Sequence, residues 1–499
     1  MISSAQRDLE ILDYEQEIGR LEDVGQGQAT PNIDRAKSYL SPICRLPPEI
    51  MGEIFMLYQE LHCHKKDVHY REPISSHKLM TALRLGSVSS LWRNISLSTP
   101  YLWSRFNICL TPDIEPVHTC ELLELYISRS KQLPLCFQLY IDIEDVIVNE
   151  EHMRILRLLT DECHRWGHVI WNPYFVPHEG MRSFLNTKRL LPTLQALDLR
   201  EHESEDWDPT DSTFAGATSL RELTMQIRDP TQTKLQLGQI RHLRITRMSI
   251  PVGIIPFFGE LSISCPILQS LYLEVDDVPV GAQDGTHEIS FFMLECLEFK
   301  TMTWYELDWI FSTLTLPSLR KLSLDDCCDV DPFTRAPGGT DAFYSFISRS
   351  KCPLSALKLI LPRNPSGVPD LLRSAPSSVI ELTLHESYGW SFINKDLVQS
   401  LHTPSSINDF PLHSQQSATI LPNLRKLDLR VDVGKEDFDS STLLDMIQSR
   451  ISNDDAGDTI CKCLEDIKIG LRNGGNGSDL QKCLQSLRKP GVTIEVFHL

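Results

Sequence analysis

One spacing of apolar residues recurs through most of this chain: an apolar position, two variable residues, a second apolar position, one variable residue and a third apolar position. The ten clear examples begin at Leu194, Leu220, Ile240, Leu268, Leu294, Leu319, Leu354, Val379, Leu424 and Leu464. Chance would produce the loose pattern roughly fifteen times in a chain of this length, but the form with leucine at all three positions only about once. Five of the ten have the strict form, and in four of those five a proline stands two residues earlier.

The spacing predicts stacked, parallel strands. The last two apolar positions of each unit alternate as in a short β-strand that points both side chains inward. Successive units start 20 to 45 residues apart, and the shorter intervals match the repeat period of a solenoid. We therefore expect an α/β solenoid over 107–499, with parallel strands on its concave side and helices on its convex side.

Segments between the motifs support this fold. Amphipathic helices are predicted over 121–130, 342–350 and 441–450. Weaker strands are predicted over 135–141, 168–171 and 492–497.

The N-terminal part has a different pattern. Over 1–40, a few apolar positions among many charges predict a helical or partly disordered leader. Over 41–106, short helices are expected, the first of which carries Ile50, Ile54 and Leu57 on one face. This second segment is predicted to be a small all-α domain.

The composition of the chain argues against several classes of function. The chain has 499 residues, of which 41% are hydrophobic, and a formal net charge of −19. That acidic balance argues against non-specific nucleic-acid binding and against binding to an anionic membrane surface. We expect neither a signal peptide nor a membrane span, because no basic leader precedes an apolar run and no apolar stretch is long enough. The 14 cysteines are then expected to be reduced, in the cytoplasm or the nucleus.

Patterns that would indicate catalysis are weak. His62, Cys63, His64 and His69 lack the paired C-x-x-C ligands of a structural zinc site. The glycine-rich stretch at 473–477 lacks the phosphate-binding form. We expect no catalytic, cofactor-binding or metal-binding residues. An enzyme stays open as the weakest alternative, and it would require titratable groups that converge in one pocket.

Residues 42–106 resemble an F-box, in the form common among mushroom-type fungi. The resemblance rests on Leu46-Pro47-Pro48-Glu49-Ile50, Ile54-Phe55, Leu85 to Val88, Trp92-Arg93 and the coda Ser98-Thr99-Pro100-Tyr101-Leu102-Trp103-Ser104. The array from about residue 190 onward is similar to the irregular leucine-rich repeats of such proteins. The chain departs from the family in the polar insert 62–77 and in Ser89, where a cysteine is frequent.

The resemblance implies a non-enzymatic adaptor. F-box helices dock on the Skp adaptor of an SCF-type cullin–RING ubiquitin ligase, and the repeat domain binds a protein substrate. The positions that match the docking surface are Leu46, Pro47, Pro48, Ile50, Ile54, Phe55, Val88 and Trp92. A leucine-rich-repeat scaffold without a ligase role remains an alternative.

The middle residues of the predicted strands should face the concave surface. We hypothesise that a protein substrate binds there, at Arg200, Gln226, Arg244, Tyr272, Glu274 and Lys300. Arginine and tyrosine are favoured anchors in protein interfaces. For any one of these residues, a place on an ordinary solvated sheet face fits the pattern equally well.

Overall fold

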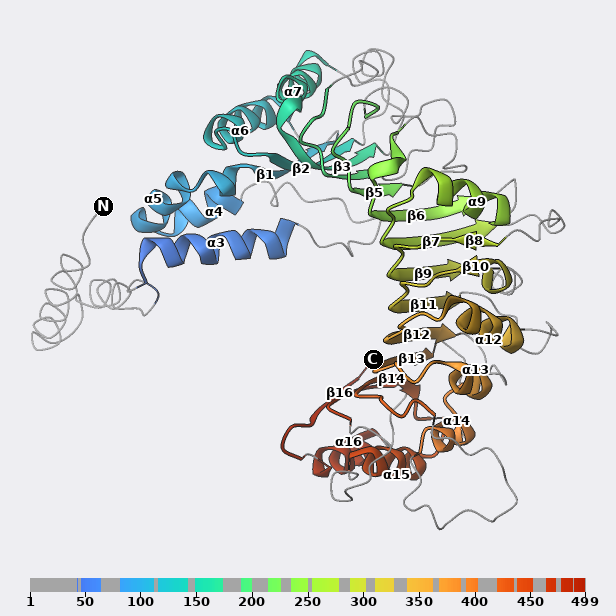
Figure 1. Ribbon diagram of the computed structural model, residues 1–499. Helices are drawn as coiled ribbons and strands as arrows, with labels where there is room; N and C mark the ends of the chain where they lie inside the picture. Colours follow the sequence, from blue (N-terminus) through green and yellow to red (C-terminus); the bar gives the residue numbers. More distant parts are fainter. Residues whose placement is uncertain are drawn as a thin grey trace, which may run out of the picture. The chain divides into compact units, whose positions relative to one another are not determined.

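The computed structural model in Figure 1 describes residues 43, 46–63, 81–111, 115–141, 149–173, 190–199, 214–225, 235–249, 254–277, 288–301, 310–326, 339–361, 368–386, 392–402, 420–434, 438–451, 464–472, 477–487 and 489–498. The chain divides into two compact units, Met1–Leu194 with Glu201–Trp207 and Gln195–Arg200 with Asp208–Leu499. Both units combine helices with parallel strands.

The described part of the first unit starts with helices. These are α3 (Pro48–Cys63), α4 (Thr81–Val88), α5 (Ser90–Ser98) and the short 3-10 helix η3 (Pro100–Trp103). The α5 helix begins after Ser89, whose hydroxyl accepts a hydrogen bond from the Trp92 amide (3.2 Å) and so satisfies a first-turn donor. A hydrogen bond from Ser96 Oγ to the Ala82 carbonyl (2.8 Å) joins α5 to α4.

Three parallel strands follow among the described residues of the first unit. They are β1 (Arg105–Leu110), β2 (Leu135–Ile141) and β3 (Trp166–Pro173), paired in that order. Figure 1 shows α6 (Pro116–Arg129) and α7 (Glu150–Asp161) together on one face of these strands. The short helix η4 (Cys163–Arg165) leads into β3.

A shared core joins these helices to the first strand. Trp103 is buried, its Nε1 donates to the Ser96 carbonyl (2.8 Å), and its ring centroid lies 5.0 Å from that of Tyr126. Gln59 of α3 is also buried, and its Nε2 donates to the Arg105 carbonyl at the start of β1 (2.7 Å). Within the first unit, α3 is therefore anchored to β1 by a polar side chain as well as by apolar packing.

The second unit is built on a parallel sheet. Its strands, in spatial and sequence order, are β4 (Ala196–Leu199), β5 (Glu222–Met225), β6 (His242–Ser249), β7 (Ser270–Asp277), β9 (Cys296–Thr301), β11 (Lys321–Asp326), β12 (Ala356–Leu361), β13 (Glu381–Glu386), β14 (Lys426–Asp432), β15 (Asp466–Arg472) and β16 (Thr493–His498). A small separate pair consists of β8 (Ile289–Ser290) and β10 (Leu314–Thr315).

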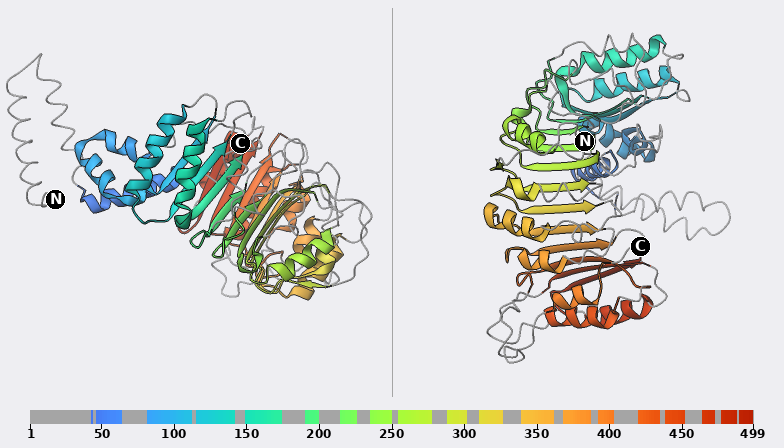
Figure 2. Two further views of the ribbon diagram at one scale, coloured as in Figure 1. Left: turned by 90° about the horizontal axis from the view of Figure 1, so that it is seen from above. Right: turned by 90° about the vertical axis from the view of Figure 1, so that its right-hand side faces the viewer.

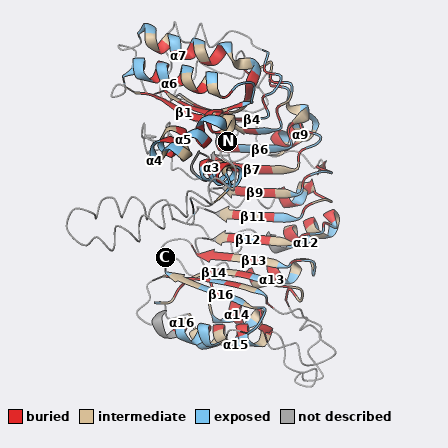
Figure 3. Ribbon diagram, turned by 90° about the vertical axis from the view of Figure 1, so that its left-hand side faces the viewer, coloured by how far each residue is buried: buried red, intermediate tan, exposed pale blue. Residues whose placement is uncertain are grey.

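Helices connect many of these strands. They are η6 (Leu237–Gln239), α9 (Ile254–Ser264), α12 (Gly339–Ser350), α13 (Val368–Ser374), α14 (Lys395–Ser400), α15 (Ser440–Ile451) and α16 (Gly477–Ser486). Figure 2 shows α9 and the orange helices around α12 on one side of the sheet. In Figure 3 the strands are largely buried or half-buried, whereas the outer sides of the helices are exposed.

The leucines of the recurring motif explain the register of this sheet. Equivalent residues stand side by side on neighbouring strands and are buried: Leu271, Leu297, Leu322, Leu357, Leu382 and Leu427. A fully buried leucine contributes about 1.5–3 kcal/mol relative to an exposed one. A slip of one residue would turn a whole strand's leucines outward, so the register is strongly specified.

A main-chain hydrogen-bond pattern repeats from strand to strand. The Gln269 carbonyl accepts from the amides of both Glu295 (2.8 Å) and Cys296 (3.0 Å). The Arg320 carbonyl accepts in the same way from Ser355 (2.8 Å) and Ala356 (3.0 Å). Both strands therefore begin with the same hydrogen-bond geometry, although the segments that connect successive strands differ in length.

The predicted mixed α/β architecture with parallel strands is confirmed, and it is compatible with a solenoid. The strands predicted at 135–141, 168–171 and 492–497 correspond to β2, β3 and β16, and the three predicted helices correspond to α6, α12 and α15. No helix among the described residues is long and apolar enough to cross a membrane. The leader predicted over 1–40 lies outside the described residues, as does the insert predicted over 62–77 apart from His62 and Cys63, which belong to helix α3. The boundary at residue 106 stays a prediction.

Candidate functional site

Helix α3 has apolar residues on two different sides. Met51 and Phe55 are buried, whereas a second row is exposed to solvent. The exposed row, the α3 apolar face, comprises Ile50, Ile54, Leu57, Tyr58 and Leu61, with exposed fractions between 40% and 69%. These residues recur at helical spacing and form one stripe. Solvent-exposed apolar stripes of this kind mark interaction sites more often than scattered single residues do.

Two residues of the neighbouring helices are also large exposed apolar side chains. Val88, at the end of α4, is 61% exposed, and Leu97, in α5, is 42% exposed. Both lie in helices that the Ser96–Ala82 hydrogen bond fixes to one another. The described helices of the first unit thus expose several large apolar side chains on a braced framework.

The structure places the eight docking residues predicted from the resemblance in three environments. Pro47, Ile50, Ile54 and Val88 are exposed, and Leu46, Pro48 and Trp92 are half-buried. Phe55 is buried, and its ring centroid lies 4.8 Å from that of Trp92. Phe55 therefore supports Trp92 from inside the domain and does not itself contribute exposed surface.

A polar contact braces the far end of α3. The Tyr101 hydroxyl donates to Glu60 Oε1 (2.5 Å), which links η3 to the helix. Burial, together with the hydrogen bond to the Glu60 carboxylate, raises the pKa of Tyr101 to about 12. The phenol stays protonated at neutral pH and remains a hydrogen-bond donor.

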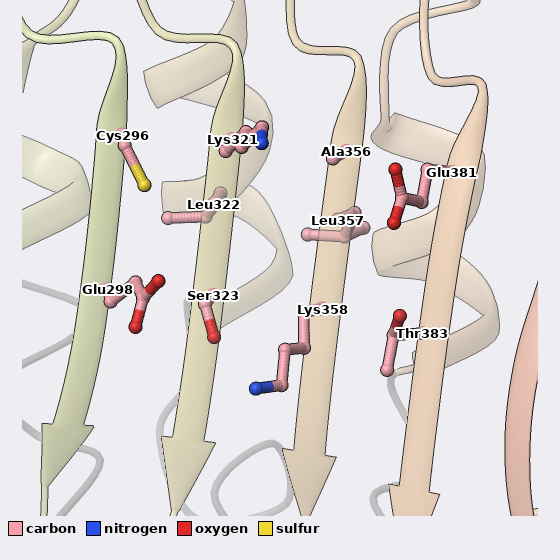
Figure 4. Close-up of a pocket in the computed structure, with 10 residues that line it drawn as sticks. All are labelled: Cys296, Glu298, Lys321, Leu322, Ser323, Ala356, Leu357, Lys358, Glu381 and Thr383. Atoms are coloured by element: carbon pink, nitrogen blue, oxygen red, sulfur yellow. The ribbon is translucent and has the colours of Figure 1, made fainter. Parts of the chain in front are cut away.

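The second unit offers a different surface. The residues between the inward-facing leucines form rows on the side of the sheet away from the helices, which we call the open sheet face; Figure 4 shows this side for β9 to β13, with helices behind. The strand register aligns one such row as Arg244, Tyr272, Glu298, Ser323, Lys358, Thr383, Asp428, Lys468 and Glu495.

Four of the predicted substrate-binding residues meet on this face. The Arg244 guanidinium lies 3.5 Å from the Tyr272 ring centroid, a cation–π contact. The Tyr272 hydroxyl donates to Glu274 Oε2 (3.3 Å), and Lys300 Nζ donates to Glu274 Oε1 (2.8 Å). Burial raises the pKa of Tyr272 to about 12, and the Glu274 carboxylate acts in the same direction. Arg200 and Gln226, which complete the predicted set, lie outside the described residues.

Further along, β13 to β16 carry a second group of paired charges. His385 Nε2 lies 3.2 Å from Asp428 Oδ1, and Lys468 Nζ lies 3.7 Å from Glu495 Oε2. Burial acts to raise the pKa of Asp428, but the hydrogen bond and charge of His385 outweigh it and the pKa is lowered. His385 was not among the residues predicted from the sequence. The signal that could have identified it is its position in β13, two residues after the outward-facing residue between the two buried leucines.

Between these two groups the open sheet face is hollowed. A shallow pocket, shown in Figure 4, is lined by Cys296, Glu298, Lys321, Leu322, Ser323, Ala356, Leu357, Lys358, Glu381 and Thr383. Burial raises the pKa of the Cys296 thiol, which is the opposite of what a nucleophilic cysteine requires. Among the described residues no group of three or more His, Cys, Asp or Glu side chains could hold a metal ion.

This chain matches no model of a known protein family, and a search of curated proteins finds no significant match.

Proposed function

We propose that this protein is the substrate-recognition subunit of an SCF-type ubiquitin ligase. In this proposal the helices of the first unit are an F-box that docks on the Skp adaptor. The second unit is a leucine-rich-repeat domain that holds a protein substrate on its open sheet face.

The observation that carries the proposal is the α3 apolar face. A helix that buries Met51 and Phe55 needs no further apolar residues for its own packing, yet Ile54, Leu57 and Leu61 remain exposed. Large apolar side chains left in water cost stability in the isolated chain and favour a partner that covers them. The Leu46-Pro47-Pro48-Glu49-Ile50 motif, which stands at the start of this helix, favours the Skp adaptor as that partner.

The open sheet face supports the second half of the proposal. It combines an arginine stacked on a tyrosine with carboxylates and lysines, all half-buried or exposed. Tyrosine and arginine are enriched among the residues that dominate protein-binding energy. The same face would serve a repeat scaffold with no ligase role, so adaptor binding is the property that separates the two functions.

The test is a pull-down with purified Skp adaptor. Ile54→Asp places a charge in the centre of the α3 apolar face, where burial by a partner would leave it unpaired. We expect adaptor affinity to fall at least about a hundredfold, since burying such a charge costs several kcal/mol.

The matched control is Val117→Asp. Val117 is 39% exposed in the first turn of α6, where an aspartate is compatible with the helix dipole. This variant should bind the adaptor like the wild type, and circular dichroism should show both variants folded. Failure of the wild type to bind, or equal binding by the Ile54→Asp variant, would overturn the proposal and leave a repeat scaffold.

A further inference from the structure

The pocket on the open sheet face has an ordered arrangement of side chains. The register places Cys296, Lys321, Ala356 and Glu381 side by side on β9, β11, β12 and β13. Two residues further along the same strands stand Glu298, Ser323, Lys358 and Thr383. Figure 4 shows these two rows, one nearer the strand starts and the other further along.

Small and charged residues alternate between the two rows. The small side chains Cys296, Ser323, Ala356 and Thr383 zigzag across the four strands and form the floor of the pocket. The complementary zigzag is Glu298, Lys321, Lys358 and Glu381, so that a chain crossing these strands meets acidic, basic, basic and acidic groups in turn. A floor of small residues leaves room for a second chain to approach the sheet closely.

These four charges differ from their neighbours on the same face. To one side Lys300 pairs with Glu274, and to the other Asp428 pairs with His385 and Lys468 with Glu495. Glu298, Lys321, Lys358 and Glu381 form no ion pair with any other described residue. Burial raises the pKa of Asp325, and the positive charge of nearby Lys358 acts in the opposite direction. The pocket thus holds charges that have no ion-pair partner among the described residues.

Strand geometry sets the spacing that a partner must match. Adjacent strands lie about 4.8 Å apart, so β9 and β13 are separated by roughly 14 Å. An extended chain advances about 3.4 Å per residue, and its alternate side chains point to the same face. Two side chains four residues apart in such a chain are therefore also roughly 14 Å apart. The residue midway between them would lie over the two lysines.

We propose that this pocket binds an extended protein segment with the pattern basic-x-acidic-x-basic, laid across strands β9 to β13. The two basic side chains pair with Glu298 and Glu381, and the central carboxylate lies between Lys321 and Lys358. This inference rests on the proposed function, because it gives the chemistry of the substrate segment that the open sheet face holds. It also places the binding site on β9 to β13, so that it starts at the end of the Arg200–Lys300 region and continues on the strands that follow.

The test uses the whole 499-residue chain on an array of short synthetic peptides of the form Gly-Thr-X-Thr-X-Thr-X-Thr-Gly. Each X is Lys, Glu or Ser in every combination. The wild type should bind the Lys-Glu-Lys peptide about tenfold or more tightly than its isomers Lys-Lys-Glu and Glu-Lys-Lys. These isomers have the same composition and net charge, so only charge order separates them.

Variants of the pocket should change that ranking in a defined way. With Lys321→Glu and Lys358→Glu together, the preferred peptide should become Lys-Lys-Lys. With Glu298→Lys and Glu381→Lys together, it should become Glu-Glu-Glu. The control Lys468→Glu lies on the same face outside the pocket and should keep the wild-type ranking.

Two results would overturn the inference: a wild-type ranking that follows net charge alone, with Lys-Lys-Lys strongest, or a ranking that the pocket variants leave unchanged. The Skp pull-down is a separate measurement on a different part of the chain. Lost adaptor binding with an intact peptide ranking would remove the ligase role and support the pocket as a binding site.

Discussion

A buried arginine near the C-terminal end of the sheet offers a sharp test of what stabilises the second unit. Arg450, at the end of α15, has an exposed fraction of 0%. Its Nε donates to the Leu401 carbonyl (2.6 Å), and its two terminal nitrogens donate to the carbonyls of Ile420 (2.6 Å) and Leu421 (3.0 Å). Leu421 has a left-handed backbone conformation (φ 50°), unusual for a residue with a side chain.

The cost of removing this guanidinium follows from those contacts. Arg450→Met keeps most of the apolar volume but leaves three buried carbonyl acceptors without this donor. Each buried unsatisfied polar group costs about 1–3 kcal/mol, and partial relaxation reduces the sum. We therefore expect a loss of about 4 kcal/mol in the free energy of unfolding. Arg450→Lys keeps the charge, but one ammonium group cannot reach all three carbonyls that the guanidinium contacts, so about half of that loss is expected.

Urea unfolding followed by circular dichroism measures this loss, and hydrogen exchange locates it. Because each strand of the sheet is hydrogen-bonded to its neighbours, exchange should accelerate first in β14, α15 and β15. The control is Arg373→Met, because Arg373 and its partner Asp370 are 56% and 63% exposed and such pairs contribute little. An Arg450→Met variant within about 1 kcal/mol of the wild type would refute the assignment of these hydrogen bonds as a main source of stability.

Two further changes test local features. Ser89→Ala removes the hydroxyl that caps α5, so the free energy of unfolding of the first unit should fall by about 1 kcal/mol, and an unchanged urea midpoint would contradict this role. Asp428 has a pKa below its ordinary value of 3.8, so its stabilising effect is present above that pH and is lost as the pH falls through the lowered pKa. Asp428→Asn should therefore weaken the dependence of stability on pH below about pH 4, which thermal melts at several pH values would measure. If the pH profile of the variant coincides with that of the wild type, this carboxylate does not contribute to the dependence.

The helices illustrate why sequence patterns predict some elements better than others. The α12 and α15 helices alternate apolar and polar residues at helical spacing and could be predicted. The α9 helix, IIPFFGELSIS, is apolar on most sides and contains a proline and a glycine, so its pattern did not indicate a helix. Its formation depends on tertiary packing, in which Phe257, Phe258 and Leu261 are buried.

The candidate surfaces were predictable only in part. Helix α3 carries apolar residues on both sides, and its periodicity cannot decide whether Ile54 or Phe55 faces the core. The structure decides this through Gln59, a polar residue that is buried because its amide meets main-chain carbonyls of η3 and β1. Arg450 similarly stands at a helix end where an arginine is expected to be solvated, and it is buried because three carbonyls converge on it.

The sequence by itself determined where the strands of the large sheet in the second unit lie and which side chains they bury, because the spacing of leucines is a local property of each segment. The charge order of the pocket was decided only by the tertiary structure. Glu298 and Glu381 are far apart in sequence, and intervals of unequal length separate the strands that carry them. Their positions around Lys321 and Lys358 exist only once the buried leucines have set the register between strands, because that register fixes which outward-facing residues become neighbours.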